Sequence, residues 1–206
     1  MKLVVTAFVT LDGVMRAPGG SDEDRSGGFA HGGWLVPFFD ADLGQFMQET
    51  FAQADAFLLG RTTYDLMQPC WSTVTDAGNA VGVALNTLPR HVATHRPASL
   101  TWQPSYPLDG DVCAAVEALK CKPGRELQVH GSHGLVQSLL RANLVDLFNL
   151  ITFPVLVGAG KRLFGDGAMP RELKLTNIQT STTGVTMARY RVAGDVKIGS
   201  FALKKQ

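Results

Sequence analysis

The sequence predicts an α/β fold with a mostly parallel central sheet and antiparallel strands at its C-terminal end. Short apolar runs alternate with amphipathic helical patterns through most of the chain, which is typical of a parallel sheet. The first run, residues 2–9, is apolar on both sides, as expected for a strand with helices on both faces. The last runs are separated by Thr183-Gly184 and Gly194-Asp195, and such short connections favour hairpins.

Residue type and spacing predict the remaining elements. Apolar, β-branched runs predict the other strands, at 56–59, 91–94, 127–129, 147–157, 173–180, 185–192 and 196–203. Apolar residues at helical spacing predict helices at 42–53, 112–119 and 135–140, and a further helix starting at 64–67. Asp109 or Asp111 is expected to begin the helix at 112. Residues 68–88 are predicted to be loop-rich, and the glycine-rich stretch 12–31 a long functional or mobile loop.

Composition narrows the classes of function. The 206 residues are 45% hydrophobic, which is sufficient for one domain spanning 1–206. The net charge of +1, without a basic stripe, argues against a nucleic-acid partner. The apolar N-terminal run ends at Asp12-Gly13, too early for a signal peptide or membrane span. The odd number of cysteines without a CxxC spacing argues against disulfides or zinc and favours the cytoplasm; they are Cys70, Cys113 and Cys121.

Two junctions between a strand and a helix predict an anion-binding site. They carry the segments Gly60-Arg61-Thr62-Thr63 and Gly131-Ser132-His133-Gly134. The first amides of a helix have no partner within it, and a glycine lets a phosphate approach them closely. Two such junctions on one sheet could hold both ends of a dinucleotide, although glycines that simply make tight turns are the alternative. Neither segment matches the GxGxxG fingerprint, so an ordinary Rossmann domain is not indicated.

Asp40 and Asp42 are the candidate catalytic acids. They follow an aromatic, apolar stretch that includes Trp34, and burial there would raise a carboxyl pKa enough for proton donation near neutral pH. The alternative is that they cap the helix that begins beside them, since Asp is a preferred N-cap residue.

Two further features have weaker functional interpretations. His130 and His133 could be drawn as metal ligands, but no third ligand is evident, so no metal is expected. The basic loop 158–162 could meet a substrate phosphate, although a solvated loop is the alternative.

Five segments together resemble one family. They are Thr10-Leu11-Asp12-Gly13-Val14, Leu59-Gly60-Arg61-Thr62-Thr63-Tyr64, Gly131-Ser132-His133-Gly134, the run 139–146 and the run 154–164. Their sequences and order resemble the three-layer dihydrofolate reductase-like fold, and especially the reductase domain of bacterial riboflavin biosynthesis. The likeness covers nearly the whole chain. One departure is Leu147, which follows Asp146 where an acidic residue is common, and we expect as a second departure that no deaminase domain precedes this one.

The resemblance implies NADPH as the cofactor and assigns residues to it. The implied contacts are Ala7 and Val14 at the nicotinamide, Arg61, Thr62 and Thr63 beside Gly60 at the adenosine phosphates, Thr94 and His95 at the 2′-phosphate, and Gly131, Ser132, Gly134, Leu135 and Val136 at the pyrophosphate. Asp42-Leu43-Gly44-Gln45-Phe46 is similar to the segment that carries the catalytic acid of bacterial folate reductases, with Asp40 as the alternative. Trp34 and Phe46 are expected to close the substrate side.

The predicted function is an NADPH-dependent reductase that acts on a C=N bond of a small nitrogen heterocycle, similar to 5-amino-6-(5-phosphoribosylamino)uracil reductase. A dihydrofolate or pterin reductase is the alternative enzyme. A nucleotide-binding protein without turnover is the alternative outside enzymes, because it needs the two junctions but no acid. The strand-rich C-terminal end and the family resemblance predict a homodimer.

Overall fold

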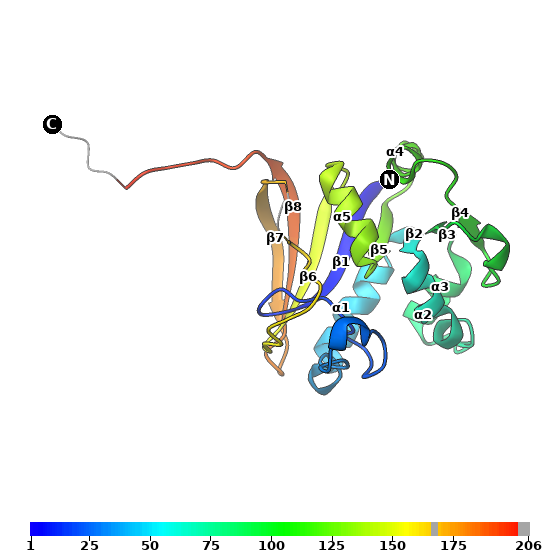
Figure 1. Ribbon diagram of the computed structural model, residues 1–206, viewed down its shortest axis with the longest axis horizontal. Coiled ribbons are helices and arrows are strands. Elements are labelled where there is room, and N and C mark those ends of the chain that lie inside the picture. Colours follow the sequence, from blue (N-terminus) through cyan, green and yellow to red (C-terminus); the bar gives the residue numbers. More distant parts are fainter. Residues whose placement is uncertain (166–168, 202–206) are drawn as a thin grey trace.

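The sheet is built around the buried strand β1, Lys2–Thr10, as its pattern predicts. The described residues, 1–165 and 169–201 of the computed structural model, form one eight-stranded sheet in the order β4-β3-β2-β5-β1-β6-β8-β7 (Figure 1). The other strands are β2 Ala54–Gly60, β3 Arg90–Ala93, β4 Ser105–Pro107, β5 Glu126–His130, β6 Leu147–Phe153, β7 Glu172–Thr180 and β8 Thr186–Gly194. The six strands from β4 to β6 in this order pair in parallel, whereas β8 pairs antiparallel with β6 and with β7.

Helices cover both faces of the sheet and complete three layers. The α-helices are α1 Ala41–Phe51, α2 Arg61–Trp71, α3 Ala80–Thr87, α4 Val112–Lys120 and α5 His133–Arg141. Apolar side chains of α1, α2 and α3 share one core with β2 and β6, and those of α4 and α5 share a second core with β1 and β5. Short 3-10 turns lie at Ser26–Gly28, Val36–Phe38 and Pro97–Ser99. The predicted fold class is therefore confirmed.

The structure differs from the predicted elements in the middle of the chain. Residues 68–88 include the end of α2 and all of α3, where a loop-rich connection was expected. The α3 sequence is apolar on nearly every side, so it lacks the polar stripe that marks a surface helix. Asn79 starts it by accepting a hydrogen bond from the Gly82 amide at 2.9 Å. The three-residue strand β4 is too short to leave a pattern in the sequence.

The C-terminal end also differs. Residues 196–201 form no strand, although 196–203 was predicted to be one, and residues 202 and 203 lie outside the described part. Strand β8 already pairs with β6 on one side and β7 on the other, so the segment after it cannot pair with β8 itself. The segment therefore runs away from the sheet (Figure 1). Similarly, β6 ends at Phe153 because Pro154 has no amide hydrogen for a ladder.

Several smaller expectations can also be compared with the structure. Asp111 and not Asp109 begins α4, because its side chain accepts a hydrogen bond from the Ala114 amide at 2.9 Å. All three cysteines are free thiols. Within the described residues, no helix combines the length and the hydropathy needed to cross a bilayer. Strand β7 lies at the sheet edge with Leu175 and Ile178 exposed, and the homodimer stays a prediction.

Arg90 connects strand β3, which lies next to the edge strand β4, to the segments around it. Its side chain is fully buried, and its guanidinium donates to the carbonyls of Leu85 and Trp102 and to the Ser105 hydroxyl. The guanidinium carbon also lies 4.1 Å from the centre of the Trp102 ring. Burial lowers the Arg90 pKa to about 10. One side chain therefore joins α3, β3 and the segment that leads to β4.

We expect Arg90→Met to lower the free energy of unfolding by about 3 kcal/mol, because the Leu85 and Trp102 carbonyls would stay buried without their donor. Urea denaturation measures the loss. Arg96→Met is the control: Arg96 is exposed, so its replacement should change stability by no more than about 0.5 kcal/mol. Equal losses in the two variants would contradict this role of Arg90.

Candidate functional site

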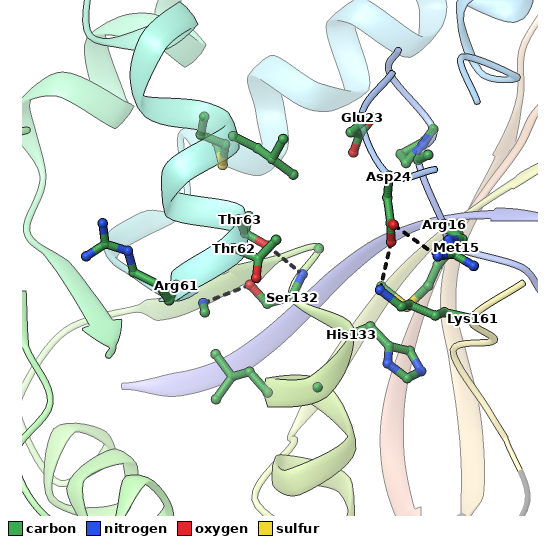
Figure 2. Close-up of a pocket in the computed structure, with 18 of the residues that line it drawn as sticks. Met15, Arg16, Glu23, Asp24, Arg61, Thr62, Thr63, Ser132, His133 and Lys161 are labelled. Atoms are coloured by element: carbon green, nitrogen blue, oxygen red, sulfur yellow. Dashed lines mark hydrogen bonds and ion pairs between the residues drawn. The ribbon is translucent and has the colours of Figure 1, made fainter. Parts of the chain in front are cut away.

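A pocket of about 640 Å³ opens where β2 and β5 end and α2 and α5 begin (Figure 2). In open parallel sheets, ligands bind at this carboxyl edge of the strands. Loop residues 15–18 and 23–24 form the opposite wall, so part of the long loop expected to be functional does face the cavity. The predicted cofactor residues among its lining are Gly60, Arg61, Thr62, Thr63, Gly131, Ser132, Gly134 and Leu135.

Hydrogen bonds lock the two strand–helix junctions together. The Gly60 amide donates to the Ser132 hydroxyl at 2.8 Å, and the Ser132 amide donates to the Thr63 hydroxyl at 3.1 Å. Gly131 and Ser132 both have left-handed backbone, with φ of 65° and 57°. For Ser132 this conformation is uncommon, and it turns the chain so that the side chain reaches the neighbouring junction. The two junctions therefore form one rigid wall of the pocket.

The helices that start at this wall lack side-chain caps. No side chain caps the first amides of α2, after Gly60, or of α5, after Ser132. Elsewhere, side chains of Asp40, Asn79 and Asp111 cap α1, α3 and α4. Uncapped amides at a helix start attract an anion, and the helix dipole adds to the attraction. The pocket thus presents two positive helix ends, which fits a ligand with more than one anionic group.

Gly134 leaves open space beside the α5 terminus. A Cβ built on it would meet nothing within 4 Å, so the backbone in the first turn of α5 is open to a ligand. A Cβ on Gly60, by contrast, would lie 3.2 Å from the Ser132 oxygen, so Gly60 is needed for the close packing of the two junctions. One glycine is thus explained by packing, while the other leaves room that a phosphate could use.

Arg61 points along α2 toward the segment after β3. Its guanidinium makes two bonds to the Asp65 carboxylate, at 2.7 and 2.9 Å, and one to the Ser99 hydroxyl at 2.5 Å. It also donates to the Arg96 carbonyl at 3.3 Å, and the Arg96 guanidinium lies 3.4 Å from the same Asp65 carboxylate. Two arginines therefore converge on one carboxylate at this end of the pocket.

Some predicted cofactor residues do not reach the cavity. Ala7 and Val136 belong to the core on the α5 side of the sheet, Val14 is also buried, and none of the three lines the pocket. Thr94 and His95 follow Ala93, which lines the pocket, but do not line it themselves. Their contacts with a cofactor stay predictions.

The structure does not bring Asp40 and Asp42 to the pocket. Asp40 caps α1 by accepting from the Leu43 amide at 3.0 Å, and its other oxygen accepts from the Thr182 hydroxyl at 3.0 Å. These hydrogen bonds lower the Asp40 pKa to about 2, the opposite of what a proton donor needs. Asp42 is exposed and accepts from the Thr182 amide at 3.3 Å. The geometry thus favours the capping alternative for Asp40, and an acid role for either stays a prediction.

Trp34 and Phe46, expected on the substrate side, are both buried and do not line the pocket. The Trp34 indole packs edge-on against Phe153 at 5.2 Å and donates to the Arg16 carbonyl at 2.8 Å. Trp34 therefore links the loop segment that carries Arg16 to the core residue Phe153. Substrate contact by Trp34 or Phe46 stays a prediction.

The histidine pair does not converge. His130 is buried, stacks on Phe51 at 4.4 Å and donates from Nε2 to the Gln128 side-chain oxygen at 3.0 Å, and burial lowers its pKa to about 3. His133 instead lines the pocket, and burial lowers its pKa as well. The described residues contain no group of three His, Cys, Asp or Glu side chains that could hold a metal ion.

Charged residues from two loops complete the pocket. The Asp24 carboxylate binds Arg16 at 3.0 Å and Lys161 at 2.7 Å, and these bonds, with a bond from Ser26, lower its pKa strongly (Figure 2). Lys161 belongs to the basic loop at 158–162, so that loop reaches the cavity through this residue. Glu23 also lines the pocket. For Arg16, Glu23 and Asp24 the only signal in the sequence was the length of the 12–31 loop, whereas Lys161 lies in the basic loop that the sequence did indicate.

Comparisons with known proteins agree with this architecture. The chain is 25% identical to the uncharacterized protein YyaP of Bacillus subtilis over 199 residues, which cover 94% of the chain and 96% of that protein. A solved structure of a putative riboflavin biosynthesis protein from Shewanella sp. PV-4 superposes with a TM-score of 0.67 at 20% identity, covering 94% of this chain and 99% of the other.

The structure of a diaminohydroxyphosphoribosylaminopyrimidine deaminase/5-amino-6-(5-phosphoribosylamino)uracil reductase from Thermotoga maritima superposes with a TM-score of 0.63 at 13% identity. The match covers 93% of this chain and 56% of the other. A pyrimidine reductase-like protein from Corynebacterium diphtheriae gives 0.59 at 15% identity, with coverages of 94% and 92%. These likenesses support the shared fold. The RibD C-terminal domain model matches residues 1–187, and the chain therefore belongs to the RibD C-terminal domain family.

Proposed function

We propose that this protein is an NADPH-dependent reductase of a small nitrogen heterocycle, of the riboflavin-pathway type. The observation that carries the proposal is the pair of uncapped helix termini locked side by side at one pocket. A dinucleotide has phosphates at its middle and its adenosine end, which matches two separate anion-binding ends. Membership of the RibD C-terminal domain family and the reductase names of its structural neighbours support the same activity.

The residues of the wall fit the cofactor in two places. The first turn of α5, with Ser132 and the open position at Gly134, would hold the pyrophosphate, and Arg61 at the start of α2 would face the 2′-phosphate end. The reduced nicotinamide, when bound, supplies the hydride. The protein's own part is to orient the substrate against it and to exclude water from the pocket.

The other end of the pocket would take the substrate. Arg16 and Lys161 line it together with His133, and the two positive charges suit a substrate with an anionic substituent, such as the phosphate of a phosphoribosylamino-pyrimidine. Because Asp24 already pairs with Arg16 and Lys161, such a substituent would have to share or replace these bonds. A folate or pterin reductase is the second candidate enzyme, and a nucleotide-binding protein without turnover is the candidate outside enzymes.

A turnover assay with the purified protein and NADPH tests the proposal. The substrates are 5-amino-6-(5-phosphoribosylamino)uracil, dihydrofolate and pterins, and the loss of the reduced-nicotinamide absorbance is followed. Oxidation with the ribosylamino-pyrimidine supports the proposed function, and oxidation with dihydrofolate or a pterin alone supports the second candidate. Tight NADPH binding without oxidation of any of them would overturn the reductase proposal in favour of nucleotide binding.

We expect Gly134→Val to weaken NADPH binding at least about tenfold, because the side chain would fill the space left for the pyrophosphate. The melting temperature should stay unchanged or rise, since the Cβ meets no atom and valine favours a helix more than glycine does. Titration calorimetry and thermal melting measure the two effects. Gly44→Val, in helix α1 and outside the pocket, is the matched control, and normal NADPH binding by Gly134→Val would count against the assigned position of the cofactor.

We expect the wild-type protein to bind NADPH roughly tenfold more tightly than NADH, because a 2′-phosphate can form charge-assisted hydrogen bonds with Arg61. Arg61→Ala should bring the two affinities close together by weakening NADPH binding alone. Titration with both cofactors measures the ratio. Arg25→Ala removes an exposed arginine outside the pocket and should leave the ratio as in the wild type. Equal affinities of the wild type for both cofactors would show that the preference is absent.

A further inference from the structure

Glu23 is a pocket carboxyl whose position is fixed but whose second oxygen is free. Its Oε2 atom accepts hydrogen bonds from the amides of Gly19 and Gly20, at 2.7 and 3.1 Å. Its Oε1 atom has no hydrogen-bond partner among the described residues. The side chain is half-buried and lines the cavity on the loop opposite Thr62 and Thr63 (Figure 2). A proton on Oε1 would therefore be held by no internal hydrogen bond, while Oε2 keeps the carboxyl of this lining residue in place.

The loop around Glu23 is fastened from both sides. Asp24, the next residue, is held by Arg16 and by Lys161, and Lys161 comes from a distant part of the chain. Before Glu23, the Ala17 carbonyl accepts from the Gly33 amide at 2.9 Å. The position of Glu23 over the cavity is thus set by ion pairs and backbone bonds.

We propose that Glu23 is the proton donor of the reductase reaction, with Asp24 as the residue that positions it. The inference rests on the proposed function and replaces Asp40 and Asp42 in that role. Hydride from the reduced nicotinamide adds to the carbon of the substrate C=N bond, and the electron pair of the broken π bond moves to nitrogen. That nitrogen takes the proton from Glu23 Oε1, leaving a carboxylate that water reprotonates. The bond order, charge and electrons balance with no further co-reactant.

The charges around the pocket favour Glu23 over the other carboxyl. Burial, with a smaller contribution from the Asp24 charge, raises the Glu23 pKa, so more of its acid form is present as pH approaches neutral. Arg16 and Lys161, which would otherwise lower it, donate to Asp24, whose pKa falls instead. Burial lowers the pKa of His133 on α5, so less of its protonated form is present near neutral pH, and Arg61 on α2 is bonded to Asp65. Removing a general acid commonly slows turnover 10²–10⁴-fold, roughly.

The decisive variant is Glu23→Gln, which keeps an oxygen to accept from Gly19 and Gly20 but cannot donate an acidic proton. We expect turnover to fall at least about 100-fold, with the NADPH dissociation constant and the melting temperature close to those of the wild type. The wild-type rate should fall as pH rises through the Glu23 pKa, because the reaction needs the acid form. The remaining rate of Glu23→Gln should show no such decrease. Asp22→Asn removes an exposed carboxylate from the same loop and is the matched control.

An NMR titration of the Glu23 carboxyl carbon in the cofactor-free protein gives a readout that does not depend on turnover. A pKa above that of an ordinary glutamate, falling toward it in Asp24→Asn as Arg16 and Lys161 are released, is the expected result. A normal or lowered pKa in the wild type overturns the inference, and so does a Glu23→Gln variant with wild-type turnover and pH profile. If the wild type oxidises NADPH with none of the substrates, the proposed function fails, and the acid role fails with it. Turnover by the wild type that Asp42→Asn abolishes and Glu23→Gln does not would sink the Glu23 role alone.

Discussion

The hydrogen bond from the Gly60 amide to the Ser132 hydroxyl is the interaction on which the candidate site depends. It joins the ends of β2 and β5, which are neighbours in the sheet, and so it fixes the relative positions of α2 and α5. Ser132 reaches it only by adopting left-handed backbone, a conformation that is unfavourable for a serine. Its hydroxyl is occupied by the neighbouring junction and does not cap its own helix, and this leaves the α5 amides open.

The helix N-termini at the pocket differ from those elsewhere in the fold. Where α1, α3 and α4 begin, a side chain satisfies the first amides, which is the stabilising solution for a helix. Helices α2 and α5, whose N-termini lie side by side at the pocket, lack such a side-chain cap. Side-chain caps are absent from both helices at this one cavity and present at the other three. This contrast indicates a binding site more strongly than either glycine motif does alone.

The sequence predicted what depends on local periodicity. The buried strand β1, the helices that carry an apolar stripe, the parallel sheet and the two glycine junctions all leave a pattern within about a dozen residues. Helix α3 was missed because it is apolar on nearly every side, and the extra strand at 196–203 was expected because a run of suitable residues cannot reveal whether a sheet edge is free. Asp40 and Asp42 looked like acids because they follow aromatic residues, but adjacency in sequence did not place them in the cavity.

The pKa of a carboxyl group depends on whether the nearby cations form ion pairs with it or with another carboxylate. These ion pairs are set by the three-dimensional structure and not by the local sequence. Glu23 and Asp24 are adjacent in the sequence, yet their pKa values move in opposite directions. Asp24 accepts the bonds of Arg16 and Lys161, and Lys161 is 137 residues away along the chain. Glu23 receives only backbone amides on one oxygen, too little to offset its burial. The cations that hold the loop in place are paired with Asp24 and leave Glu23 without a counter-charge. The same ion pairs therefore position the Glu23 carboxyl and leave its pKa raised, as the proposed acid role requires.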